Sequence, residues 1–157
     1  MTLPTVVPPK YNATVSDFLI VKADKSGAAR MEPFISSVGA AAAIGTVIGL
    51  VPFRKGARLV QEASYVQVGA AAAGAATTAS IGVIYNDNVT YANNATLYAT
   101  GVTLNTANAR VATTSSVANV DYTTLDDGWF VITTAGAITV NAMTLHGQIV
   151  LSYDPVN

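Results

Sequence analysis

The stretch "SSVGAAAAIGTVIGLVPF", residues 36–53, decides the fold class, because it is apolar and contains no charged residue. It includes the G-x-x-x-G spacing, Gly45 to Gly49, which is typical of packed membrane helices. A transmembrane helix needs about 20 strongly apolar residues, whereas this stretch also contains serines, three glycines and Pro52. Its second half, "TVIGLVPF", is rich in β-branched and aromatic residues and ends near a proline, which favours a core strand. We therefore predict a strand, with a short helix over residues 40–43 as an alternative.

The composition favours a single all-β domain with a neutral surface. The chain has 157 residues, of which 51% are hydrophobic and only 11% are charged, against about 25% charged in ordinary domains. It contains 27 Ala, 20 Val and 19 Thr, and Val and Thr suit a pleated, half-buried surface. A chain of this length can bury a sizeable core. We divide it into a Pro-rich extended N-terminal arm, residues 1–35, and a β-sandwich domain, residues 36–157.

Further short apolar runs, separated by turn signals, predict the other strands. In residues 64–68, Ser64, Val66 and Val68 alternate with two polar-tipped residues, which indicates one buried face. Residues 89–113 fit a helical face or short strands, and we favour short strands with an irregular piece. Seven or eight short strands at this spacing predict a sandwich or jelly roll. The runs are residues 18–22, 57–60, 64–68, 80–85, 129–134, 137–145 and 148–153.

The last three of these runs predict a β-meander. They are separated by "AG" at 135–136 and "HG" at 146–147, and two-residue joints of this kind connect neighbouring antiparallel strands. Within the middle run, Ile138, Val140 and Ala142 are expected to face inward. Trp129, which begins the first run, is expected to belong to the core.

The sequence contains no recognisable catalytic set, so we expect a protein that is not an enzyme and binds no cofactor. His146 is the only histidine and lies in a predicted turn, where a surface position is usual. Asp126 and Asp127 precede an aromatic strand, which is typical of a turn, and no calcium-binding loop pattern is present. There is no cysteine, and "GAAAAG" lacks the lysine of a phosphate-binding loop. The N-terminus has no basic region before an apolar run, so synthesis in the cytoplasm is expected.

The charges are distributed unevenly along the chain. Residues 1–58 carry seven basic and three acidic residues, a net charge of +4, and residues 59–157 carry one basic and six acidic residues, a net charge of −5. Both parts could simply be solvated, or the basic part could meet an acidic partner or another copy of the chain. Only Arg54, Lys55 and Arg58 cluster among the basic residues. That is too few for a nucleic-acid groove, so no nucleic-acid partner is expected.

Four stretches resemble the small capsid decoration, or cement, proteins of tailed bacteriophages, which are jelly-roll-like virion proteins. They are "IGLVPFRKGARLV", "SIGVIYNDN", "VITTAGAITVNAMTL" and "GQIVLSYDPVN". The resemblance covers residues 44–157 and lies in strand order and residue character. It implies a structural protein on the outer capsid surface, made in the host cytoplasm, that binds the major capsid protein and itself as a homotrimer and stabilises the shell. Neither a membrane nor a nucleic acid is an implied partner.

Candidate contact residues follow from this implied role. An extended arm can place its backbone beside a strand edge on a neighbour, and many weak copies on a lattice gain avidity. The expected arm contacts are Pro4, Pro8, Pro9, Lys10, Phe18 and Ile20, and the expected charged contacts are Arg30, Arg54, Lys55 and Arg58.

Two other functions remain as alternatives. A receptor- or glycan-binding module of a virion fibre or spike would use an exposed aromatic residue such as Tyr91. A hydrolase would require His146.

Overall fold

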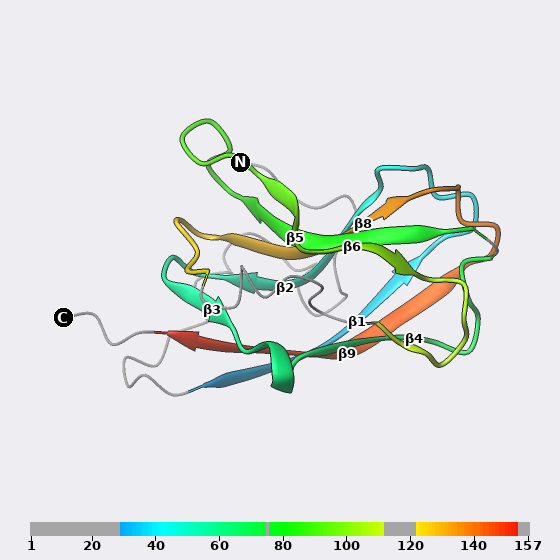
Figure 1. Cartoon of the computed structure of the whole chain (residues 1–157), viewed down its shortest axis with the longest axis horizontal. Helices are drawn as coiled ribbons and strands as arrows, with labels where there is room; N and C mark the ends of the chain where they lie inside the picture. The colour runs from blue at the N-terminus through cyan, green and yellow to red at the C-terminus, as the bar shows by residue number, and fades with distance from the viewer. Residues whose placement is uncertain (1–28, 75, 112–121, 154–157) are drawn as a thin grey trace.

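The structure is a computed structural model that describes residues 29–74, 76–111 and 122–153, and it is an all-β sandwich (Figure 1). A single short 3-10 helix, Gln61–Ala63, lies among the strands of this described part. The strands are β1 (Arg30–Val38), β2 (Val47–Phe53), β3 (Ala57–Leu59), β4 (Tyr65–Val68), β5 (Thr78–Tyr85), β6 (Asn94–Thr103), β7 (Arg110–Val111), β8 (Gly128–Ala135) and β9 (Met143–Tyr153).

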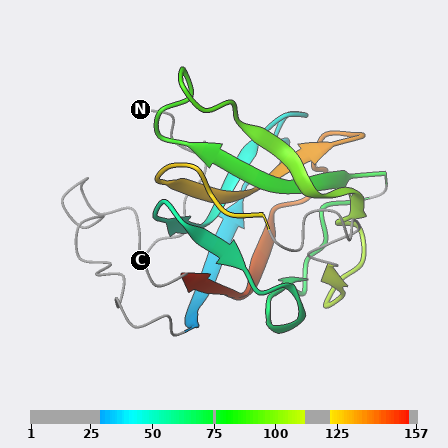
Figure 2. The same cartoon turned by 60° about the vertical axis from the view of Figure 1, so that its left-hand side comes forward.

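The strands form two antiparallel sheets in a jelly-roll order. One, the β1 sheet, has the order β1-β9-β4-β7, with β3 also paired to β9, and the other, the β2 sheet, has the order β2-β8-β5-β6. The pairs are nested: β1 with β9, β2 with β8, β4 with β7 and β5 with β6. A ribbon of nested antiparallel pairs folded over on itself is the jelly-roll arrangement. Figure 2 shows β1 and β3 on either side of the red end of β9.

The two sheets differ in how their strands are buried. In the β1 sheet residues alternate, so Phe34 and Val38 face the core while Met31 and Ile35 are exposed. In the β2 sheet, strands β2, β5 and β8 are buried almost continuously, whereas the edge strand β6 is buried only at its centre. Continuous apolar runs such as "TVIGLVPF" indicate strands covered on both faces. Residues 36–53 thus end in a core strand, β2, as predicted, and residues 40–43 form a loop, not the alternative short helix.

The predicted C-terminal meander is wrong. Residues 136–142 form a loop that crosses between the sheets, and residues 143–153 form the single long strand β9. The inward and outward positions are also reversed, because Ile138 and Val140 are 52% and 64% exposed while Thr139 is buried. The "HG" pair lies within β9, where Gly147 permits close approach to β4. A Cβ there would collide with the carbonyl oxygen of Tyr65.

The sheet edges carry features that hinder further strand pairing. Edge strand β1 contains Pro33 and edge strand β2 contains Pro52, and proline lacks the amide that a ladder needs. At the other edges, β7 has only two residues and β6 pairs with β5 through two register shifts. Association through these edges is therefore disfavoured.

The expected boundary between arm and sandwich at residue 35 falls inside β1, so residues 30–35 belong to a sheet. The rest of the arm, with the predicted strand at 18–22, lies outside the described residues. Within the described ranges, no helix has the length and apolar character that a membrane crossing requires.

Candidate interaction surfaces

The charged residues gather at one end of the sandwich, which we call the charged end. It consists of loops 54–56, 86–93 and 122–127 together with the start of β1, the short strand β3 and the end of β9. Eight of the ten charged residues in the described part of the chain belong to it, the other two being Glu62 and Arg110. The eight are Arg30, Glu32, Arg54, Lys55, Arg58, Asp87, Asp126 and Asp127.

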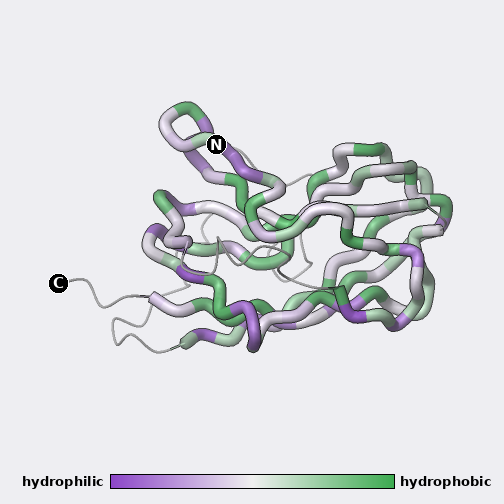
Figure 3. The backbone as a smooth tube through the Cα atoms, in the orientation of Figure 1, coloured by the Kyte–Doolittle hydropathy of each residue, from purple (hydrophilic) through white to green (hydrophobic). Residues whose placement is uncertain are grey.

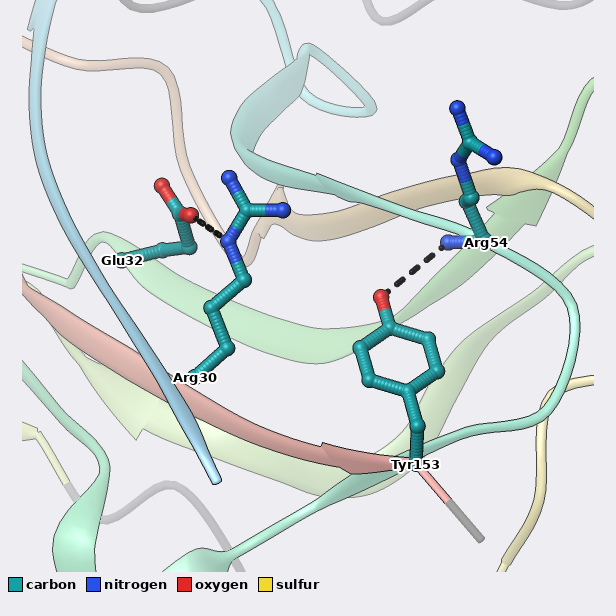
Figure 4. A network of polar contacts seen from close by, with 4 residues as sticks. All are labelled: Arg30, Glu32, Arg54 and Tyr153. Atoms are coloured by element: carbon teal, nitrogen blue, oxygen red, sulfur yellow. Dashed lines mark hydrogen bonds and ion pairs between the residues drawn. The ribbon is translucent and has the colours of Figure 1, made fainter. Parts of the chain in front are cut away.

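At the charged end, Tyr153 contacts the backbone of Arg54, and Arg30 pairs with Glu32 (Figure 4). Its hydroxyl accepts a hydrogen bond from the backbone N–H of Arg54 at 3.4 Å, while the Arg54 guanidinium points away from the ring. Arg30 forms an ion pair with Glu32 on the same strand. Burial raises the pKa of Tyr153, partly offset by the Arg54 hydrogen bond and the nearby positive charges. Tyr153 therefore contacts the backbone of Arg54 and not its guanidinium.

The side chain of Thr124 holds the backbone of the turn that carries Arg54 and Lys55. The buried Thr124 hydroxyl donates to the carbonyl of Arg54 at 3.0 Å and accepts from the N–H of Ala57 at 2.8 Å. The backbone N–H of Lys55 donates to Asp127 Oδ1 at 2.8 Å. These bonds fix the backbone of the turn, so little backbone entropy remains to be lost there when a partner binds.

The opposite end, which we call the neutral end, contains no charged residue. It consists of the four loops 39–46, 69–77, 104–109 and 136–142, at the right of Figure 1. Backbone hydrogen bonds connect these loops: Ala41 donates to Thr139, Val140 donates to Ala73, and Ala73 donates to Leu104. Figure 3 shows loop 39–46, at the upper right, in white to green shades.

The neutral end combines exposed apolar side chains with strained backbone. Ile44, Ile138 and Val140 are each more than half exposed. Ala41 and Ala76 have φ values of 61° and 62°, a left-handed conformation that costs a non-glycine residue about 1–2 kcal/mol. Strain of this kind persists where the surroundings enforce it and is common at functional sites.

The outer face of the β1 sheet is a third exposed surface. Arg110 lies over the ring of Tyr65 with 4.2 Å between the guanidinium carbon and the ring centroid. His146, which we expected in a turn, lies mid-strand on β9 between Ile35 and Gln67.

Tyr91, the aromatic residue expected for glycan binding, is half-buried and packs against Tyr85 with 6.0 Å between ring centroids.

The structure brings some predicted contact residues together. Arg30, Arg54, Lys55 and Arg58 meet at the charged end because β1 and β3 flank β9, where Arg30 and Leu59 both pair with Leu151. Sequence reasoning missed the neutral end, although its signal was present as charge-free runs at residues 63–86 and 128–153. The predicted arm contacts lie outside the described residues: Pro4, Pro8, Pro9, Lys10, Phe18 and Ile20.

Within the described part of the chain, no group of three or more acidic or histidine side chains could hold a metal ion. Comparisons of the chain with protein-family models, with curated proteins and with solved structures found no match.

Proposed function

We propose that this chain is a non-enzymatic structural protein of a bacteriophage virion, which decorates the outer capsid surface and stabilises it. It binds the lattice of the major capsid protein through the charged end and associates with its own copies, as a homotrimer, through the neutral end. The observation that carries this proposal is the separation of eight charged residues at one end from four charge-free loops at the other.

Each end suits a different kind of partner. Contact between copies around a symmetry axis brings identical residues close together, so charges there would repel their equivalents. The neutral end has none, and its loops present Ile44, Ile138 and Val140. The charged end carries charges of both signs, with Arg54 and Lys55 on a turn whose backbone is fixed, which suits a surface of complementary charge and different composition.

The proposed role needs only modest affinity from each copy. Many copies bound to a repeating lattice, and to one another, gain avidity without a strong single contact. The proline-containing and short edges also limit uncontrolled strand addition, as a protein present at high local concentration requires.

The test uses virions whose genome encodes the chain, stripped of it and then mixed with purified protein. The wild-type chain is expected to co-sediment with the particles and to appear as surface protrusions in electron micrographs. The double variant Arg54→Glu, Lys55→Glu should lose at least about tenfold in binding, whereas Arg110→Glu, which changes one charge outside the charged end, should bind normally. The proposal is wrong if the chain does not bind particles or if the double variant coats them as well as wild type does.

A further inference from the structure

The outer face of the β1 sheet displays polar and planar side chains in two rows that cross its strands. In each strand these residues alternate with core residues, such as Val66 in β4, Leu145 in β9 and Val111 in β7. Because successive side chains of a strand point to opposite faces, the rows point away from the core. Figure 1 shows β1, β9 and β4 side by side in one layer. The two rows, which we call the outer rows, are Ile35–His146–Gln67–Arg110 and Pro33–Gln148–Tyr65.

The register of the sheet makes the first row continuous. His146 pairs with Ile35 on one side and with Gln67 on the other, and Gln67 pairs with Arg110. Neighbouring strands are about 4.8 Å apart, so the row extends about 14 Å from β1 to β7. Every side chain of the outer rows is partly or fully exposed. The surface therefore has the dimensions for an extended ligand that lies across the strands.

Three planar groups of the outer rows are held in place by the protein itself. The guanidinium of Arg110 lies over the ring of Tyr65, a contact that uses its face and leaves the N–H donors in its plane to grip a carboxylate. Gln67 donates to the carbonyl of Asn108 and Gln148 donates to the carbonyl of Ala63, both at 3.0 Å. Each amide also has an acceptor oxygen and a second N–H. Groups ordered in advance lose little entropy on binding.

The chemistry of the outer rows indicates the class of ligand. Arg110 is always positively charged, and no residue of the rows is acidic, the neighbouring Glu62 lying outside them in the 3-10 helix. Beside Arg110, the amide, imidazole and phenol groups both donate and accept hydrogen bonds. A ligand that carries a carboxylate and many hydroxyl groups satisfies both features.

We propose that the outer rows bind an oligosaccharide that carries carboxylate groups. Arg110, stacked on Tyr65, binds a carboxylate of the saccharide, and Gln67 and His146 form hydrogen bonds with its hydroxyl groups. The outer rows belong to neither the charged end nor the neutral end, so this proposal is independent of the proposed function. The protein would bind a saccharide through its sheet face while its two ends stay available to other partners.

The test is a nuclear magnetic resonance titration of the full-length, ¹⁵N-labelled protein with an alginate hexasaccharide, in which every sugar carries a carboxylate. Backbone signals of β4, β7 and β9 should shift. Arg110→Gln should weaken binding at least about tenfold, and Arg110→Lys at least about fivefold, because an ammonium group lacks the planar fork. The control Glu62→Gln changes a charge outside the rows and should alter the affinity less than about twofold. All three side chains lie outside the core, so the melting temperature should be retained.

Two other ligands separate the saccharide from its charge. Mannohexaose, which has the same length and no carboxylate, should bind at least about tenfold more weakly than the alginate hexasaccharide, and so should hexaglutamate, which has carboxylates and no sugar. Equal binding of hexaglutamate would assign the surface to acidic peptides and overturn the proposal. Unchanged affinity of Arg110→Gln, or signal shifts confined to other strands, would overturn it as well.

Discussion

The hydroxyl oxygens of Tyr85 on β5 and Tyr122 in the segment before β8 lie 2.6 Å apart. Burial, followed by this hydrogen bond, raises the pKa of Tyr85, and burial also raises the pKa values of Tyr98 and Tyr153. The neutral form of each phenol is thus favoured in the folded protein.

The first prediction is that the protein is sensitive to alkali. An unfolded tyrosine titrates near pH 10. Since the folded pKa values are higher, the stabilisation from these three residues is complete below about pH 10 and is lost as the pH rises through the folded values. Urea unfolding at a series of pH values should give a free energy of unfolding that is flat from pH 7 to about pH 9.5 and then falls. Tyrosinate absorbance that accounts for all seven tyrosines well before unfolding would contradict this prediction.

The second prediction compares two buried tyrosines. In the described part of the chain the Tyr98 hydroxyl is buried without a hydrogen-bond partner, whereas that of Tyr85 bonds to Tyr122 and accepts from the N–H of Leu125. A buried polar group without a partner is costly. Tyr98→Phe should therefore raise the free energy of unfolding by about 1 kcal/mol, and Tyr85→Phe should lower it by about 1–3 kcal/mol. If urea unfolding shows that both variants lose the same free energy of unfolding, this assignment of hydrogen-bond partners is wrong.

The third prediction concerns strain at the neutral end. Ala41 is exposed with φ 61°, a conformation that glycine adopts without penalty. Ala41→Gly should therefore raise the free energy of unfolding by up to about 1 kcal/mol, after the entropy that glycine adds to the unfolded state. The control Ala40→Gly, next to it and also exposed, should lower stability by roughly 0.5–1 kcal/mol. Thermal unfolding of both variants measures each change in stability relative to wild type, and the two changes should be opposite in sign.

The fourth prediction tests self-association through the neutral end. Ile138→Lys, Val140→Lys would place two positive charges per copy where identical loops are proposed to meet. Sedimentation velocity should show monomers at concentrations where the wild type is oligomeric, with little change in melting temperature because both side chains are exposed. The control Val89→Lys alters a residue that is 93% exposed at the charged end and should leave the oligomer intact. Dissociation by the control alone would assign the contact to the other end.

The sequence was sufficient to predict strands where one face of a sheet is covered. Ser64, just before β4, and Val66 and Val68 within it are buried as expected, because a period of two reports a single buried face directly. The same period misled at residues 137–142. There, Thr139 is buried because its hydroxyl accepts from Ala42 and donates to Gly39, nearly a hundred residues earlier, and no local pattern contains that partner.

The candidate surfaces were only partly predictable for a similar reason. Arg54 and Lys55 are neighbours in the sequence, so their cluster was visible. Arg30 joins them because of the register of β1 on β9, and the neutral end exists because four loops from distant positions meet there. Residue character could be read from the sequence, but the end of the sandwich on which each loop lies depends on the nested pairing.

That nested pairing also constrains how the protein is made. The first described strand, β1, pairs with β9, the last one, so β1 has to wait on the ribosome until almost the whole chain has been synthesised. At about 5–20 residues per second, this interval is on the order of 10 s. A nascent chain of this topology therefore spends most of its synthesis with β1 and β2 unpaired, because their partners β9 and β8 are made last. A messenger cut short before the codons for β9 would yield an incomplete chain that chaperones bind or proteases degrade.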